Sequence, residues 1–440
     1  MSRRARPAEG GARLEEEIQR IARPLRSPED LDPLIDAIGD ARYVLLGEAT
    51  HGTSEFYTWR TEISKRLIVE KGFSFIAVEG DWPDCYSVNR FVKGRDGESA
   101  TDVLHAFSRW PTWMWANREV VDLARWLRIH NDRLPAAQQA GFYGLDVYSL
   151  WDSMHAVVDY LERLDPDLAR GARRAYSCFE PYEEDAQEYA RATALVPTSC
   201  EEEAVRILAA LRSKSSELKE DGADAYFNAE QNALVARNAE RYYRTMVRGG
   251  PASWNVRDHH MVETLERLMA HHGPRARAIV WEHNTHVGDA RFTDMARSGM
   301  VNVGQLVRQH HGRDGVCIVG FGTDRGTVMA ASGWGEPMQR MTVPPAREGS
   351  YESAITRSGI GDSLLLFGDS SVDALSELRG HRAIGVVYDP RTEHWGNYVP
   401  TVLPRRYDAF IFIEETSGVD ALHLPARIDG EVPETYPTGQ

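Results

Sequence analysis

Short runs of consecutive apolar residues recur along the chain and are separated by stretches whose apolar positions repeat at helical spacing. Seven runs have the length of a buried strand: RYVLLGE (42–48), FSFIAVE (73–79), GFYGLD (141–146), ARAIVWEH (276–283), DGVCIVGFG (314–322), AIGVVYD (383–389) and DAFIFIE (408–414). Strands that are apolar on both faces and alternate with helices are typical of parallel sheets. The pattern therefore predicts an α/β fold with a central, mainly parallel sheet covered by helices.

Two amphipathic helices are predicted before the first strand, at 14–25 and 27–39. In the second, Ser27 suits the N-cap, Pro28 the first helical position and Gly39 the C-terminal stop. Between 149 and about 248 no strand pattern occurs, and long helical segments of mixed charge predict a helical insertion that caps the sheet. The stretch 333–350 has the proline and glycine content of a loop.

These changes of pattern predict five parts of the chain. They are an N-terminal extension and helix (1–26), a first part of the α/β core (27–148), a helical cap subdomain (149–250), a second part of the core (251–424) and a C-terminal tail (425–440).

The composition is that of a soluble globular protein. Fifty-one Lys and Arg stand against 66 Asp and Glu, and the net charge of -15 opposes binding of nucleic acid. No apolar run approaches the roughly eighteen residues of a membrane span, so a cytoplasmic location and no membrane partner are expected. The cysteines are widely separated and are expected as buried free thiols: Cys85, Cys178, Cys200 and Cys317. The oligomeric state stays open.

Ionisable residues directly follow four of the predicted strands. The groups are Glu48 and His51, then Glu79 and Asp81, then Asp146, and finally Glu282, His283 and His286. Parallel sheets bind ligands outside the carboxyl ends of their strands. We therefore expect these side chains to share one site.

The segment GEATHG (47–52) holds the first acid and imidazole of this set. Two glycines permit a tight turn in which Glu48 and His51 project into the same space. A neighbouring carboxylate fixes the tautomer of an imidazole and raises its basicity, as a general base requires. The alternative is that Glu48 caps the next helix and His51 only packs. Arg60, in that helix, could bind an anionic group or form an ion pair with Glu48.

His283 and His286 are three positions apart, which would place both on one side of a helical turn. With Glu48, His51 and Glu79 they could bind a metal, although no HExxH motif occurs. A GxSxG nucleophile elbow, a Walker loop and a strand-to-helix GxGxxG are also absent. The residues that remain are suited to activating water directly.

Substrate contacts are expected from aromatic and polar residues near these motifs. The tryptophans could wall an apolar pocket or pack in the core, and the segment SWNVRDHHM (253–261) could line a cleft or start a helix. The residues assigned to substrate binding are Trp82, Trp113, Trp115, Asp146, Arg257, Asp258 and His260.

Four segments, LLGEATHGTSEFYTWR, AVEGDW, WNVRDHHM and WEHNTHVGD, resemble in this order the erythromycin esterase-like family. The resemblance runs from about Leu31 to Ile413. It implies an α/β fold with a helical subdomain and hydrolysis of a macrolide lactone by water without a required metal. It also implies a catalytic set with His51 as the base: Glu48, His51, Arg60, Glu79, His283 and His286.

The sequence therefore predicts a hydrolase that cleaves a carboxylic ester or lactone in a large, partly apolar small molecule and uses no cofactor. In this hypothesis Arg60 and one of the two downstream histidines stabilise the oxyanion and protonate the leaving group. Two alternatives stay open. One is a metal-dependent hydrolase that uses the same His/Glu cluster, and the other is a non-catalytic protein that binds haem or another small ligand.

Overall fold

The structure is a computed structural model that describes residues 7–95, 99–182, 186–195, 199–218, 222–246, 250–368 and 372–423. The tail expected at 425–440 lies outside these ranges. None of the helices within them combines the length and apolar character that crossing a membrane requires.

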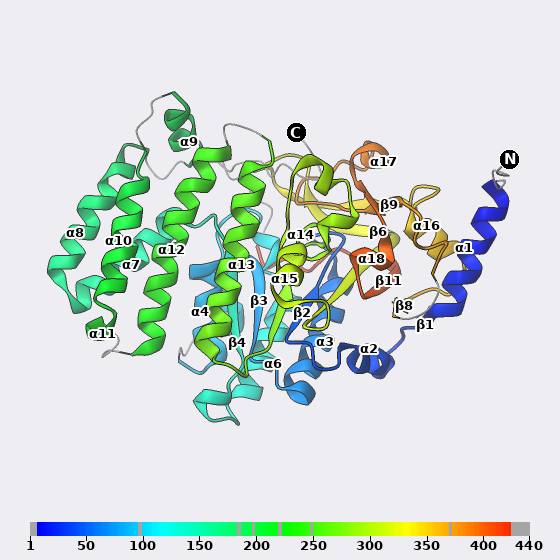
Figure 1. Cartoon of the computed structure of the whole chain (residues 1–440), viewed down its shortest axis with the longest axis horizontal. Coiled ribbons are helices and arrows are strands. Elements are labelled where there is room, and N and C mark those ends of the chain that lie inside the picture. Colours follow the sequence, from blue (N-terminus) through cyan, green and yellow to red (C-terminus); the bar gives the residue numbers. More distant parts are fainter. Residues whose placement is uncertain are drawn as a thin grey trace.

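A nine-stranded mixed sheet forms the centre of the described chain, in the order β1-β8-β11-β6-β2-β5-β3-β4, with β7 paired to β6 (Figure 1). The five pairings from β11 to β4 are parallel, and β1, β7 and β8 add antiparallel pairs at the other side. The strands are β1 (Ala22–Pro24), β2 (Tyr43–Leu46), β3 (Phe75–Asp81), β4 (Gly141–Asp146), β5 (Ala278–Trp281), β6 (Val316–Ala331), β7 (Met338–Val343), β8 (Ser363–Leu366) and β11 (Ala409–Thr416). The expected α/β fold is confirmed.

Helices cover both faces of the sheet. They are α1 (Pro7–Ile21), α2 (Asp32–Ile38), α3 (Ser54–Lys71), α4 (Trp82–Val92), α5 (Ala100–His105), α6 (Arg118–Asn131), α13 (Ala252–His272), α14 (Asn284–Val287), α15 (Val303–His311) and α16 (Tyr351–Arg357). Short helices α17 (Glu393–Gly396) and α18 (Leu403–Arg406) flank a separate antiparallel pair, β9 (Arg379–Arg382) and β10 (Tyr398–Thr401).

Alternating side chains of each central strand enter two different hydrophobic cores. In β5, Ile279 and Trp281 pack with residues of α2, α3 and α6, whereas Ala278 and Val280 pack with residues of α1, α13, α15 and α16. All four are fully buried. This two-faced burial explains why the strands read as continuous apolar runs.

Six further helices lie together beyond β4, at the end of the molecule opposite the N-terminus (Figure 1). They are α7 (Leu150–Leu164), α8 (Pro166–Tyr176), α9 (Ala186–Leu195), α10 (Glu201–Ser213), α11 (Ser215–Leu218) and α12 (Ala223–Met246), and they enclose a hydrophobic core of their own. The division of the chain at 149 and 250 stays a prediction.

The expectation of four free thiols is wrong for two cysteines. Cys178 and Cys200 form a disulfide within this helical region, while Cys85 and Cys317 are free and buried. The two cysteines lie 22 residues apart, and only the packing of the surrounding helices brings them together.

Six of the seven predicted strands are present, and AIGVVYD (383–389) is the exception. Its backbone makes only isolated bridges at Ile384 and Val387. The loop predicted at 333–350 is also wrong in part, because β7 occupies 338–343. That strand is buried only at its two ends, Met338 and Val343, so it lacks an apolar run.

The helix boundaries predicted near the N-terminus are confirmed in part. The helix predicted to reach residue 25 ends at Ile21, because Ala22–Pro24 form β1 and pair with β8. Ser27 is an N-cap followed by Pro28, although a 3-10 turn precedes α2, and Gly39 ends α2 with a φ of 54°. A left-handed φ of this kind favours glycine.

Candidate functional site

The carboxyl ends of β2, β3, β4 and β5, with the residues that follow each, are called the first, second, third and fourth strand exits. At the first exit, Glu48, His51 and the nearby Arg60 form a buried chain of contacts. Nδ1 of His51 lies 2.9 Å from Glu48 Oε1, and Arg60 Nη2 donates to Glu48 Oε2 at 2.6 Å. All three side chains are at most 3% exposed. Glu48 therefore contacts both partners and does not cap α3, whose N-cap is Thr53.

Close packing explains the two glycines of this turn. A Cβ atom at Gly47 would clash with the amide of Asn284, and one at Gly52 would clash with the backbone carbonyl of Met329. Neither glycine has a left-handed φ. The glycines thus allow the fourth strand exit and β6 to approach the loop that carries His51, which is a different reason from the strained turn expected from sequence.

His283 faces His51 across the site. The two ring centroids are 4.8 Å apart and the rings are tilted by 37°. His283 is the N-cap of α14, its backbone N–H donates to Glu79 Oε2 at 2.8 Å, and its Nδ1 lies 2.8 Å from the Thr285 hydroxyl. The first and fourth strand exits therefore meet, as the sequence predicts.

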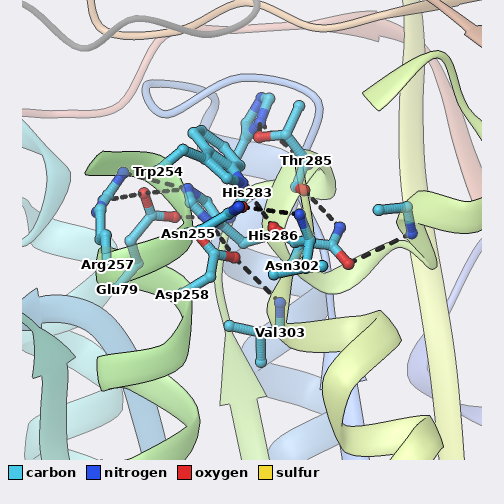
Figure 2. A network of polar contacts seen from close by, with 12 residues as sticks. Glu79, Trp254, Asn255, Arg257, Asp258, His283, Thr285, His286, Asn302 and Val303 are labelled. Carbon is cyan, nitrogen blue, oxygen red and sulfur yellow. Dashed lines mark hydrogen bonds and ion pairs between the residues drawn. The ribbon is translucent and has the colours of Figure 1, made fainter. Parts of the chain in front are cut away.

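His286 lies deeper and has different neighbours (Figure 2). Its Nδ1 is 3.0 Å from Asp258 Oδ1, its Nε2 is 3.5 Å from Glu79 Oε1, and its ring stacks on Trp254 with centroids 4.4 Å apart. Burial lowers the pKa of His286, but the carboxylates of Asp258 and Glu79 outweigh it and raise this pKa well above its usual value. His286 is thus held between two acids, whereas the ring of His283 faces His51.

Arg257 connects the second and third strand exits. Its Nη2 donates to Glu79 Oε1 and to Asp146 Oδ2, each at 2.7 Å, and its Nη1 lies 3.1 Å from His286 Nε2. Arg257, Asp146 and Asp258 were expected to bind substrate. The structure places Arg257 against Glu79 and Asp258 against His286 (Figure 2), and Asp146 contacts Arg257.

Glu282 was not assigned a role from sequence and is an unusual feature of the site. Its side chain is 1% exposed, and neither carboxyl oxygen has a hydrogen-bond partner among the described residues. Burial, reinforced by the charges of Glu79 and Asp258 and opposed by His286, raises the pKa of Glu282 well above its usual value. The raised pKa favours the protonated form of Glu282. Its position directly after a buried strand was the available sequence signal.

Arg60 occupies the position of a structural partner. It is fully buried, and its guanidinium carbon lies 4.5 Å from the ring centroid of Tyr57 and 4.7 Å from that of Trp281. Together with the bond to Glu48, this environment supports the ion-pair alternative for Arg60.

The remaining expected substrate contacts are buried. Trp82 and Trp113 are at most 1% exposed within the two sheet cores, and the indole of Trp115 donates to the backbone oxygen of Glu79 at 2.9 Å. His260 bridges Asn238 of α12 and the backbone oxygen of Asp146. Burial lowers the pKa of His260 to about 4. These contacts favour the core-packing alternative for the three tryptophans. His260 lies in α13, which begins at Ala252, so the helix-start alternative holds for its segment.

A model of the erythromycin esterase family matches residues 68–416. The chain is 22% identical to "Putative hydrolase YbfO" of Bacillus subtilis (strain 168), over 90% of both proteins. It is 21% identical to erythromycin esterase type II of Escherichia coli, over 77% of this chain and 84% of that protein.

Two solved structures share the fold. A succinoglycan biosynthesis protein superposes with a TM-score of 0.77 and 22% identity, over 93% of this chain and 98% of that one. A histidine-to-asparagine mutant of erythromycin esterase EreC in its open conformation gives a TM-score of 0.67 and 17% identity, over 91% and 97%.

The fold is of the α/β class, with a His/Glu cluster beyond the carboxyl ends of its parallel strands. The chain belongs to the erythromycin esterase family and is a hydrolase of that type. The family model begins after Glu48, His51 and Arg60, so the assignment of these three residues rests on the geometry of the site.

Proposed function

We propose that this chain hydrolyses a carboxylic ester or a macrocyclic lactone by attack of water that His51 activates. The Nδ1 proton of His51 points at Glu48, which makes Nε2 the basic nitrogen. Nε2 takes a proton from water, and the resulting hydroxide attacks the carbonyl carbon. The product of this step is a tetrahedral intermediate with a negative oxygen.

His283 is the donor that we assign to this oxygen, because its ring is the one that faces His51. When the intermediate collapses, the bond from carbon to the leaving oxygen breaks and the proton on His51 passes to the alkoxide. One ester and one water thus give one carboxylic acid and one alcohol. His286, buried against Asp258 and Trp254, is better suited to hold Glu79 than to contact substrate.

Glu48 and Glu79 act as positioning residues in this mechanism. Glu48 fixes the ring of His51, and Arg60 neutralises the charge of Glu48. Glu79 holds the backbone of His283 and is itself held by Arg257. The single observation that carries the proposal is the meeting of His51 and His283, each of which is fixed by a different glutamate.

The positions of the donor atoms support catalysis without a metal. Among the described residues, one group of three potential metal ligands has donor atoms within 4.8 Å of one another, namely Glu266, His310 and His311. This group does not include His51, His283 or their glutamate partners. The His51 and His283 region therefore lacks the convergent ligand set that a catalytic zinc uses.

The test is hydrolysis of a panel of macrolide lactones and simple esters by the purified protein in heavy-oxygen water. Macrolides come first because a relative is an erythromycin esterase. The expected product is an acid with one heavy oxygen in its new carboxylate. Absence of hydrolysis across the panel, or a product without the heavy atom, would overturn the proposal.

A further inference from the structure

Three metal-binding side chains meet away from the His51 site, between α13 and α15. They are Glu266, His310 and His311, and one donor atom of each lies within 4.8 Å of the others. Glu266 Oε1 is 2.5 Å from His311 Nε2 and 3.7 Å from His310 Nδ1. An ion pair between Glu266 and His311 does not explain why Nδ1 of His310 also lies close to the carboxylate of Glu266.

The cluster lies toward the C-terminal ends of α13 and α15. Nearer their N-terminal ends, the same two helices meet at a residue of the candidate active site. There, the backbone N–H of Val303 donates to Asp258 Oδ1 at 3.0 Å. Eight residues separate Asp258 from Glu266 and eight separate Val303 from His311. The two helices therefore run in the same direction for about 12 Å and are tied at both ends.

The surroundings of Glu266 orient its carboxylate toward the two histidines. The Tyr43 hydroxyl donates to Glu266 Oε2 at 3.4 Å, and the Tyr43 ring stacks on His311 with centroids 4.3 Å apart. Outer contacts of this kind fix ligands in metal sites. The histidines also lie in the last turn of α15, where the carbonyl end of the helix favours a cation.

We propose that Glu266, His310 and His311 bind one divalent transition-metal ion of the zinc type. Two imidazole nitrogens and one carboxylate oxygen form a ligand set that Zn²⁺ accepts in tetrahedral geometry, with water in the fourth position. The side chain of His310 is 51% exposed, which gives the ion a route from solvent. The bound ion holds the last turn of α15 against α13.

This site makes no contact with the groups assigned to catalysis, so its test is independent of the proposed function. Full-length chain without a histidine tag is stripped with a chelator and titrated with Co²⁺, whose visible absorption reports tetrahedral nitrogen and oxygen ligands. The expected result is binding of one ion, with at least a tenfold loss of affinity in Glu266→Gln and in His310→Ala.

Two control variants locate the ion. The double variant His51→Asn/His283→Asn and the variant His271→Ala should both bind Co²⁺ as tightly as the unmodified chain. His271 is a suitable control because it lies on α13, as Glu266 does, and pairs with one carboxylate, that of Asp224 in α12. Unfolding of each metal-free variant at the temperature of the unmodified chain shows that the fold is retained.

The proposal is overturned if no saturable binding occurs, if Glu266→Gln and His310→Ala bind as tightly as the unmodified chain, or if the His51/His283 double variant loses the ion. Unfolding provides a second readout. Zn²⁺ should raise the unfolding temperature of the unmodified chain but not that of Glu266→Gln, and an equal rise in both would contradict the site.

Discussion

Glu79 in β3 and Glu282, the residue directly after β5, occupy matching positions at the edge of the parallel sheet. Val78 of β3 is in register with Trp281 of β5, and both enter the core beside α3. The residues that follow them, Glu79 and Glu282, therefore point to the opposite face, toward α13. There Glu79 bonds with Arg257 and the backbone of His283, whereas Glu282 has no partner among the described residues. A pair with one charged and one protonated carboxyl is the stable arrangement.

The variant Glu282→Gln should be more stable than the unmodified chain at and above neutral pH. Because the pKa of Glu282 is raised in the folded state, unfolding releases its proton above its ordinary pKa of 4.5, and stability falls as pH rises. Glutamine imitates the protonated acid and removes this dependence. Urea unfolding at a series of pH values measures how the free energy of unfolding changes with pH in the unmodified chain and in Glu282→Gln.

Glu352 provides the matched control, because it is an equally buried glutamate with partners. It accepts hydrogen bonds from the backbone N–H of Arg382 at 2.8 Å and from His381 Nδ1 at 2.6 Å. Burial alone would raise the pKa of Glu352, but His381 and Arg382 lower it below its usual value. Glu352→Gln should therefore destabilise the fold at neutral pH. Equal destabilisation by Glu282→Gln would show that Glu282 is ionised.

The variant Arg60→Gln should lose both activity and stability. It leaves the buried carboxylate of Glu48 without its counter-ion, a change that typically costs about 3 to 5 kcal/mol. The double variant Glu48→Gln/Arg60→Gln should regain part of the stability but not the activity, since His51 stays without its acid. A double-mutant cycle in urea, with turnover measured in parallel, tests this. Full stability of Arg60→Gln would contradict the pairing.

Acid should destabilise the fold through His260. Burial lowers the pKa of this imidazole from 6.5 to about 4, so the unfolded chain binds the proton first. The contribution of His260 to stability is complete above pH 6.5 and is lost as pH falls toward 4, with a total of about 3 kcal/mol. His260→Gln should flatten unfolding curves in this window. An unchanged pH dependence in this variant would contradict a buried neutral imidazole.

Removal of metal should leave hydrolysis unchanged. The only convergent donor group among the described residues is Glu266, His310 and His311, outside the catalytic cluster. Dialysis against a strong chelator, followed by elemental analysis and assay, should remove the ion and retain turnover. Loss of turnover that returns with added metal would favour a metal-dependent hydrolase.

Much of the site was predictable because parallel strands deliver the residues that follow them to one edge of the sheet. This rule brings His51 and His283 together from distant parts of the chain. Motif spacing also indicated Glu48 as the partner of His51. The same rule predicts that Glu282 lies at the site. Its raised pKa depends on burial and on the nearby charges of Glu79 and Asp258, which the sequence does not show.

Other features depend on packing that no local pattern records. Trp82 and Trp113 looked suited to an open pocket, yet they are buried in sheet cores. Arg257 looked suited to substrate, yet it is enclosed by Glu79 and Asp146. The disulfide of Cys178 and Cys200 and the edge strand β7 were missed for the same reason.

The central claim is that His51 and His283 perform the chemistry together. The most direct measurement compares kcat/KM for an ester or lactone substrate in the unmodified chain, His51→Asn, His283→Asn and the control His272→Asn. His272 ends α13 and contacts Tyr143 in the body of the sheet. Losses of about a hundredfold or more are expected for the first two variants and none for the control. Turnover by either His51→Asn or His283→Asn within about twofold of the unmodified chain would contradict the account.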